Sequence, residues 1–135
     1  MTPRVKESEF GLSAIGQIAL PVEDLSRAVA FYRDSLRLPL LFEAPPGLAF
    51  FDCGGIRLML DRATRHTGQG RSIIYFRVAE ITLAYDTLRS RGIGFEDAPH
   101  LIHKFPDHEL WMCFFRDSEG NSLALMSEVK PGGRR

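Results

Sequence analysis

The sequence predicts an α+β fold built from two tandem βαβββ modules. An internal repeat supports this, because one constant offset aligns Ile18 with Ile74 and Val22 with Val78. Each copy passes from the apolar/polar alternation of a strand to the apolar spacing of a helix. The last segment, residues 113–128, has the pattern of a β-hairpin, with two apolar runs around a polar turn that ends in Gly and Asn.

The first module is expected at residues 15–61. It begins with a strand over residues 15–22, and Asp24 is a suitable N-cap for a helix whose apolar spacing continues to Leu38, before Pro39. The Pro-Pro-Gly and Gly-Gly turns that follow separate three further strands. These strands are expected at residues 40–43, 48–53 and 56–61.

The second module is expected at residues 72–128. Its helix has an apolar stripe that begins at Ile81 and stops at Gly92, a typical residue after a helix end. Strands are predicted over residues 94–98, 109–116 and 121–128, with a loop over residues 100–107. The whole chain of 135 residues is predicted to be one domain. Its other parts are a leader (1–14), a connection (62–71) and a mobile tail (129–135).

Composition restricts the class of protein. The 17 basic and 17 acidic residues cancel, so no nucleic-acid partner is expected. No segment has the apolar length of a signal peptide or a membrane span, which predicts a cytoplasmic protein that does not contact membranes. Two cysteines on different predicted strands, Cys53 and Cys113, are expected to be core thiols rather than a disulfide.

Two stretches carry a family resemblance. IGQIALPVEDLSRAVAFYRDSL at residues 15–36 and FFRDSEGNSLAL at residues 114–125 resemble the opening and closing signatures of the vicinal oxygen chelate superfamily. That superfamily includes glyoxalase I, bleomycin-resistance proteins and extradiol dioxygenases. The resemblance implies curved mixed sheets that form a cup, with helices outside and a ligand cavity inside. It also implies a homodimer.

In metal-using relatives, one side chain on each of four strands binds a divalent ion, usually through His, Glu or Gln, His and Glu. The resemblance places these positions at Gln17, Met59, Ile73 and Ala124. Only Gln17 offers an oxygen, and a single amide oxygen is a weak ligand for a hard cation. We therefore expect no metal and no cofactor.

The candidate ligand-binding residues are Gln17, Arg57, Met59, Tyr75, Ser122 and Met126, which strand alternation places on the inward face, together with Trp111, the only tryptophan. Arg57 supplies a fork for a carboxylate or phosphate, and Tyr75 and Gln17 supply neutral hydrogen bonds. The alternatives are that Gln17 and Tyr75 satisfy each other and that Arg57 pairs with Asp61. Trp111 suits stacking on a flat ligand, or packing in a core or dimer interface.

Three classes of function follow. The first is a glyoxalase/bleomycin-resistance-like protein that has lost its metal site and sequesters or senses a small organic ligand. The alternative is an enzyme, a lactoylglutathione-lyase-like lyase or a dioxygenase. Its chemistry would come from loop histidines with an ion, or from acid–base work by Tyr75, Asp61 and Arg57. The histidines concerned are His100, His103 and His108. Catalysis by Cys113 is not expected, because no His or carboxylate is predictably placed to activate its thiol. The third possibility is a module that acts through dimerisation.

Overall fold

A computed structural model describes residues 12, 14–62 and 72–130. The leader, connection and tail expected from the sequence lie mostly outside these residues. The elements follow the order expected for two βαβββ modules. They are β1 (Gln17–Pro21), α1 (Leu25–Ala30), the π-helical turn η2 (Phe31–Ser35), β2 (Leu40–Ala44), β3 (Leu48–Cys53), β4 (Ile56–Asp61), β5 (Ile74–Arg77), α2 (Ile81–Ser90), β6 (His100–Lys104), β7 (Glu109–Arg116) and β8 (Ser122–Val129).

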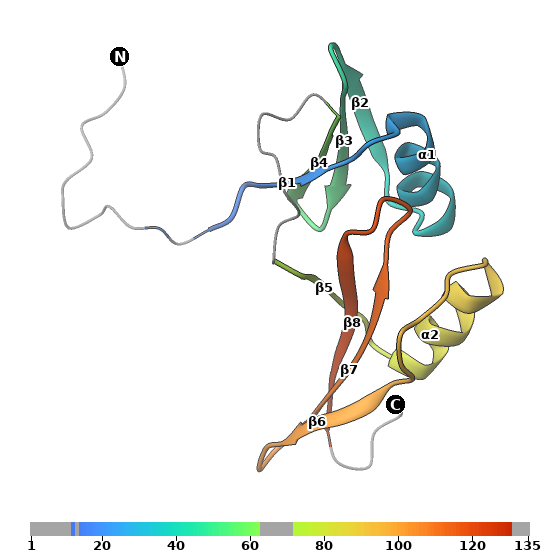
Figure 1. Ribbon diagram of the computed structural model, residues 1–135. Coiled ribbons are helices and arrows are strands. Elements are labelled where there is room, and N and C mark those ends of the chain that lie inside the picture. The colour runs from blue at the N-terminus through green and yellow to red at the C-terminus, as the bar shows by residue number, and fades with distance from the viewer. Residues whose placement is uncertain (1–11, 13, 63–71, 131–135) are drawn as a thin grey trace, which may run out of the picture.

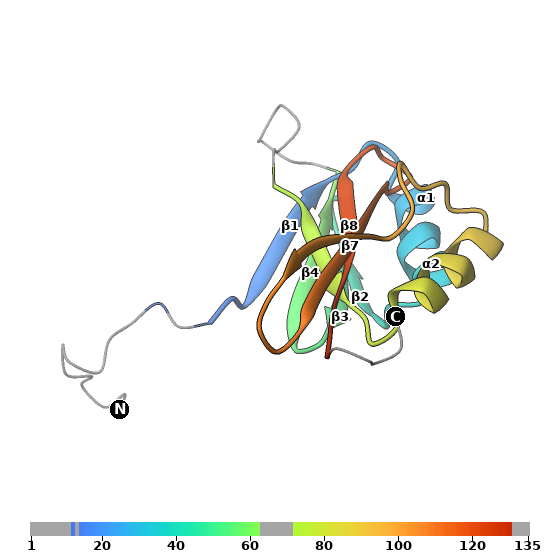
Figure 2. The ribbon, with the colours of Figure 1, turned by 90° about the horizontal axis from the view of Figure 1, so that it is seen from below.

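Each module forms one mixed sheet of four strands. The strand orders are β1-β4-β3-β2 and β5-β8-β7-β6, so the two sheets have the same topology. The first strand of each module pairs in parallel with the last, and the other pairs are antiparallel. Both helices lie on the same side of the sheets, which leaves the opposite faces uncovered (Figures 1 and 2). The predicted α+β fold of tandem modules is confirmed.

Local sequence signals explain where the helices begin and end. Asp24 caps α1, because its Oδ1 accepts a hydrogen bond of 3.0 Å from the backbone N–H of Arg27. The helical segment stops at Ser35, earlier than predicted, and Arg37 then takes a positive φ of 59°. The α2 helix ends as predicted, with Gly92 at a φ of 90° that favours glycine.

One strand prediction is wrong. Residues 94–98 form only an isolated bridge from Phe95 to Phe115, and the strand lies instead at β6, in the predicted loop. Every residue of β6 is exposed, and the strand pairs only with β7, at the sheet edge. An exposed edge strand needs no apolar face, so its sequence lacks the periodicity that would reveal it.

The core lies between the helices and the sheets. It is one continuous cluster with contributions from both modules, including Leu20, Tyr32, Phe51, Leu60, Ile81, Cys113, Phe115 and Leu123. Among the described residues, no helix combines the length and the apolar composition needed to cross a membrane.

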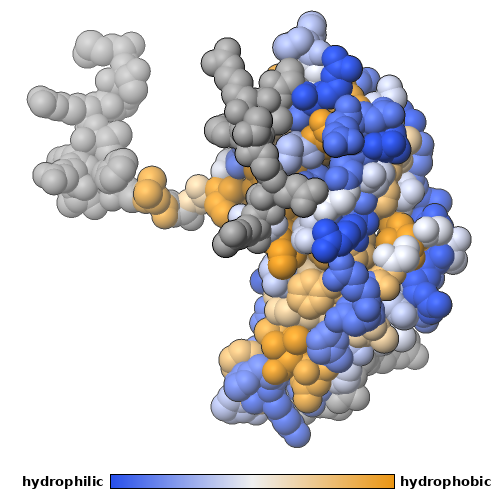
Figure 3. Space-filling model, in the orientation of Figure 1, coloured by the Kyte–Doolittle hydropathy of each residue, from blue (hydrophilic) through white to orange (hydrophobic). Residues whose placement is uncertain are grey.

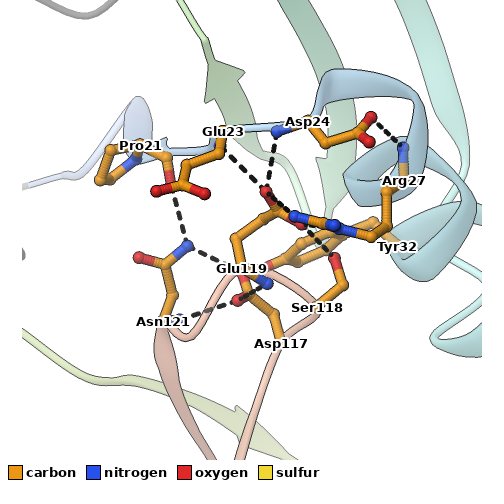
Figure 4. Close-up of polar contacts among 9 residues, drawn as sticks. All are labelled: Pro21, Glu23, Asp24, Arg27, Tyr32, Asp117, Ser118, Glu119 and Asn121. Atoms are coloured by element: carbon orange, nitrogen blue, oxygen red, sulfur yellow. Dashed lines mark hydrogen bonds and ion pairs between the residues drawn. The ribbon is translucent and has the colours of Figure 1, made fainter.

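Glu119 joins the second module to the first. Its side chain is only 1% exposed and projects from the β7–β8 turn against the start of α1 (Figure 4). Glu119 Oε1 accepts hydrogen bonds of 2.9 Å from the backbone N–H groups of Glu23 and Asp24. Arg27 pairs with both carboxylate oxygens, from Nε at 2.7 Å and from Nη2 at 3.1 Å. The carboxylate thus satisfies free N–H groups before the first turn of a helix in the other module.

The residues around Glu119 reinforce this junction. Tyr32 is fully buried and donates from Oη to Asp117 Oδ2 at 2.7 Å. Asn121 donates from Nδ2 to the carbonyl of Pro21 at 3.0 Å and to Asp117 Oδ2 at 2.8 Å. Burial raises the pKa of Tyr32, so its hydroxyl stays a donor. We call the set Glu119, Asp117, Asn121, Arg27 and Tyr32 the junction cluster.

We predict that Glu119→Gln destabilises the fold by about 1–3 kcal/mol. The reason is that a buried carboxylate, which accepts strong hydrogen bonds, is replaced by a neutral amide. Urea unfolding followed by circular dichroism measures this difference. Glu96→Gln is the matched control, because the Glu96–Arg116 ion pair is about half exposed (51% and 56%) and should contribute little. Equal effects of the two substitutions would contradict the role given to Glu119.

The same cluster predicts a pH dependence. The hydrogen bonds from Arg27, together with those from nearby backbone N–H groups, lower the pKa of Glu119 from 4.5 to about 2. A depressed folded-state pKa means that the stabilisation is complete above the ordinary pKa and declines as the pH falls from about 4.5 towards 2. The stability difference between the wild type and Glu119→Gln should therefore shrink over this range in urea unfolding. A difference that stays constant would show that the carboxylate charge is not responsible.

Candidate functional site

The uncovered sheet faces carry most of the residues selected from the sequence. In the first sheet, β1 pairs with β4 so that Gln17 lies beside Arg57 and Ala19 beside Met59. In β3, Phe50 lies opposite Met59 on the same face. Ile18, Leu20, Leu58 and Leu60 alternate with these residues and belong to or pack against the core cluster. The uncovered side of this sheet is called the first open face.

Polar and aromatic contacts hold Arg57 on the first open face. Its Nε donates to Gln17 Oε1 at 2.8 Å, and its guanidinium carbon lies 5.3 Å from the centre of the Phe50 ring. Gln17 Nε2 points to Met59 Sδ at 3.8 Å, a weak contact. Gln17 therefore pairs with Arg57, whereas the sequence left open a pairing with Tyr75 and a pairing of Arg57 with Asp61.

A β-bulge brings Phe42 onto the same face. Leu40 pairs with Phe51 on the core side, yet Phe42 pairs with Phe50 on the open side, because the register shifts between them. The Phe42 and Phe50 rings stack with their centres 4.4 Å apart and their planes 25° apart. Phe42 is 47% exposed and Phe50 only 8%, so the outer ring offers a flat apolar surface.

The uncovered side of the second sheet, the second open face, is more apolar. Tyr75 pairs with Ala124 and lies edge-on to Phe114, with ring centres 6.0 Å apart. Met126 and Ser122 share this face by alternation along β8. Apolar side chains gather over this part of the molecule in Figure 3, and the exposed apolar residues in and near β5 and β6 include Ile73, Tyr75, Leu101 and Ile102.

Trp111 is not on the second open face. It pairs with Ser127 in β8, on the side that faces α2, and packs against the core cluster. Its Nε1 donates to Glu109 Oε1 at 3.1 Å. This position fits the core alternative raised by the sequence and does not support stacking of Trp111 on a ligand at the second open face.

The three histidines near β6 do not form a metal cluster. His108 lies between two carboxylates, with Nδ1 2.7 Å from Asp107 Oδ1 and Nε2 3.3 Å from Glu128 Oε2. His100 Nδ1 instead lies 3.0 Å from the carbonyl of Ala98, and His103 packs edge-on to Phe105. Across residues 12, 14–62 and 72–130, no three His, Cys, Asp or Glu side chains are grouped to hold an ion.

Other catalytic candidates are also kept apart. Cys113 is fully buried in the core, and burial raises the pKa of its thiol to about 12. Tyr75 belongs to the second sheet and Asp61 and Arg57 to the first, and the described residues contain no hydrogen bond or ion pair between any two of them. Asp61 Oδ1 is buried and has no hydrogen-bond partner among the residues that the structure describes.

A separate groove of about 580 Å³ runs beside α2. Its apolar lining includes Leu36, Leu38, Phe76, Leu83 and Leu88. It lies mainly among residues of the core side rather than on the open faces, and its lining also includes the polar residues Arg77, Glu80, Thr87 and Arg91. We prefer the first open face as the candidate site because a hydrogen bond from Gln17 and the Phe50 ring hold its charged group, Arg57, in place.

Sequence reasoning missed two residues of this candidate site. The sequence placed Phe50 in a strand but did not select it for the ligand-binding face. Phe42 follows a bulge, which turns its side chain to the opposite face from the one that alternation predicts. A bulge leaves no reliable mark in residue periodicity, so only the pairing register reveals it. Whether any of these residues binds a ligand stays a prediction.

Comparisons with known proteins agree with the fold. The sequence model of the Glyoxalase/Bleomycin resistance protein/Dioxygenase superfamily matches residues 14–125. The uncharacterised protein YraH of Bacillus subtilis is 29% identical over 126 residues, covering 81% of this chain and 94% of that relative.

Two solved structures are similar over most of the chain. A lactoylglutathione lyase from Agrobacterium tumefaciens has a TM-score of 0.67 and 28% identity, covering 85% of this chain and 93% of its own. A glyoxalase/bleomycin resistance protein/dioxygenase from Nocardioides has a TM-score of 0.68 and 24% identity, covering 93% of this chain and 92% of its own.

The reactivity of the two thiols tests whether Cys113 can act as a nucleophile. Burial raises the pKa of Cys113 to about 12 and also raises that of the partly exposed Cys53. We predict that iodoacetamide at about pH 8 leaves Cys113 of the folded protein unmodified and modifies Cys53 slowly, whereas both react in denaturant. Peptide mass spectrometry identifies the modified residue. Rapid modification of Cys113 in the folded protein would reinstate it as a candidate nucleophile.

Proposed function

The chain belongs to the Glyoxalase/Bleomycin resistance protein/Dioxygenase superfamily, and from this premise we propose that it binds a small organic ligand without a metal ion. Binding would sequester or sense the ligand on the open faces of the sheets. The observation that carries the proposal is the use of Gln17, at the first family metal position, to orient Arg57.

The residues at the family's metal positions do not fit a divalent cation. Gln17 Oε1, the one hard donor among them, already accepts a hydrogen bond of 2.8 Å from the Arg57 guanidinium. A cation bound there would lie beside a permanent positive charge and be repelled. Met59 offers only a thioether, and Ile73 and Ala124 have no donor atoms.

The open faces support ligand binding in another way. They combine partly exposed aromatic rings, Phe42 and Tyr75, with the polar groups of Gln17 and Arg57. An apolar wall with a few oriented polar groups is the usual composition of a small-molecule site. A homodimer, as expected from the family resemblance, is part of this proposal, and sedimentation analysis measures it.

The enzyme alternative has less support. Its acid–base group would need Tyr75, Asp61 and Arg57 at one place, yet Tyr75 lies on a different sheet from the other two. Its metal-dependent form would need a ligand set beyond His100, His103 and His108, which make separate contacts. No observation favours a particular reaction, so we assign no catalytic residue.

We predict that protein purified without chelators carries less than about a tenth of an equivalent of metal, because three of the four positions lack hard donors. Plasma mass spectrometry measures the content, before and after incubation with zinc, nickel, manganese and ferrous iron. None of these ions should raise Tm, since only ligands that prefer the folded state stabilise it. Near-stoichiometric metal, retained through dialysis, would overturn the proposal.

A second measurement addresses binding itself. A panel of small organic anions and neutral aromatic compounds is screened by thermal shift, with Arg57→Ala and Tyr75→Ala compared with the wild type. At least one compound should raise Tm in the wild type and do so less in a variant. Tm shifts that survive both substitutions would remove the open faces as the site.

A further inference from the structure

We propose that the first open face recognises planar organic carboxylates, with Arg57 as the binding group and the Phe42–Phe50 stack as the flat platform. This inference rests on the proposed function and names the class of ligand. In this arrangement a fixed guanidinium supplies the positive charge that metal-using relatives obtain from an ion.

Arg57 is held ready for a carboxylate. Its Nε is engaged by Gln17 at 2.8 Å, and its guanidinium lies over the Phe50 ring at 5.3 Å. These contacts restrict the orientation of the fork before a ligand arrives, which reduces the entropy lost on binding. Within residues 12, 14–62 and 72–130, no hydrogen bond or ion pair engages its two terminal nitrogens. A carboxylate has two oxygens in one plane, which a guanidinium can bind in parallel.

Neighbouring carboxylates do not occupy the fork. Asp52 lies opposite Arg57 across β3 and β4, but its Oδ1 accepts the backbone N–H of Gly55 at 3.2 Å. Asp61 lies four residues further along β4 and makes no ion pair with Arg57. The positive charge therefore remains available to a ligand.

The aromatic pair defines the rest of the ligand. Phe42 is 47% exposed and is supported from beneath by the buried Phe50 ring, in a stack whose centres are 4.4 Å apart. Phe50 also contacts the Arg57 guanidinium, so the charge and the platform are adjacent. A ligand that bridges them has a carboxylate joined to a flat, conjugated group. Inorganic phosphate carries the charge but has nothing to place on Phe42.

The test is isothermal titration calorimetry of the full chain with naphthoate. Three probes separate the contributions: naphthalenemethanol has the ring without the charge, cyclohexanecarboxylate has the charge without the flat ring, and inorganic phosphate has only charge. Naphthoate should bind most tightly of the four. Naphthalenemethanol binding as tightly as naphthoate would overturn the inference.

Substitutions locate the binding group. Arg57→Gln should weaken naphthoate binding about tenfold or more. Arg57→Lys should bind naphthoate with an affinity between those of Arg57→Gln and the wild type, because an ammonium keeps the charge but lacks the fork. Phe42→Leu should weaken naphthoate several-fold and leave cyclohexanecarboxylate nearly unchanged. Arg33→Gln is the matched control, because Arg33 is a 51% exposed cation of η2, away from the open faces, whose loss should have no effect. Circular dichroism confirms that each variant folds.

The outcomes separate this inference from the proposed function. If neutral aromatic compounds bind and Arg57→Gln leaves naphthoate affinity unchanged, the carboxylate inference fails and the proposed function stands. Arg33→Gln weakening naphthoate as much as Arg57→Gln does would also defeat the inference. If the wild type binds no compound of any class, both fail.

Discussion

The carboxylate of Glu119 is the contact on which the arrangement of the two modules depends. It comes from the β7–β8 turn of the second module and caps the backbone before α1 in the first, where Arg27 neutralises it. Helix starts leave N–H groups without intrahelical partners, and a buried anion satisfies them and the local dipole together. With Tyr32 and Asp117 bonded beside it, this contact fixes one module against the other and keeps both open faces on the side away from the helices.

The repeat is not symmetric at this point. The offset that aligns Asp24 with Glu80 places Leu83 where the first module has Arg27, and Leu88 where it has Tyr32. The equivalent turn of the first module, between β3 and β4, is shorter and contains only Gly54 and Gly55, so it offers no carboxylate like that of Glu119. The junction cluster therefore holds the start of α1 against the opposite module, whereas α2 borders a groove and is joined to the first module at its end, where Arg91 donates to the carbonyl of Ser35 at 2.9 Å.

The fold was largely predictable, because it depends on signals that act locally. Caps such as Asp24, the glycine after α2 and the turns between strands each act within a few residues. The failures share a different cause. The edge strand β6 and the bulge before Phe42 depend on which strand pairs with which, and at which register. The alternation placed Gln17, Arg57 and Met59 together, but their contact with Phe50 and Phe42 needed the structure.

The central claim is that the first open face uses a fixed guanidinium in place of a metal ion. Each arginine Nε–Hε group gives its own nuclear magnetic resonance signal in isotope-labelled protein, so a titration with naphthoate reports on every arginine at once. The account predicts that the signal of Arg57, assigned through its loss in a variant, moves furthest and saturates. If that signal stays fixed while other arginine signals move, the positive charge of the site lies elsewhere and the claim is wrong.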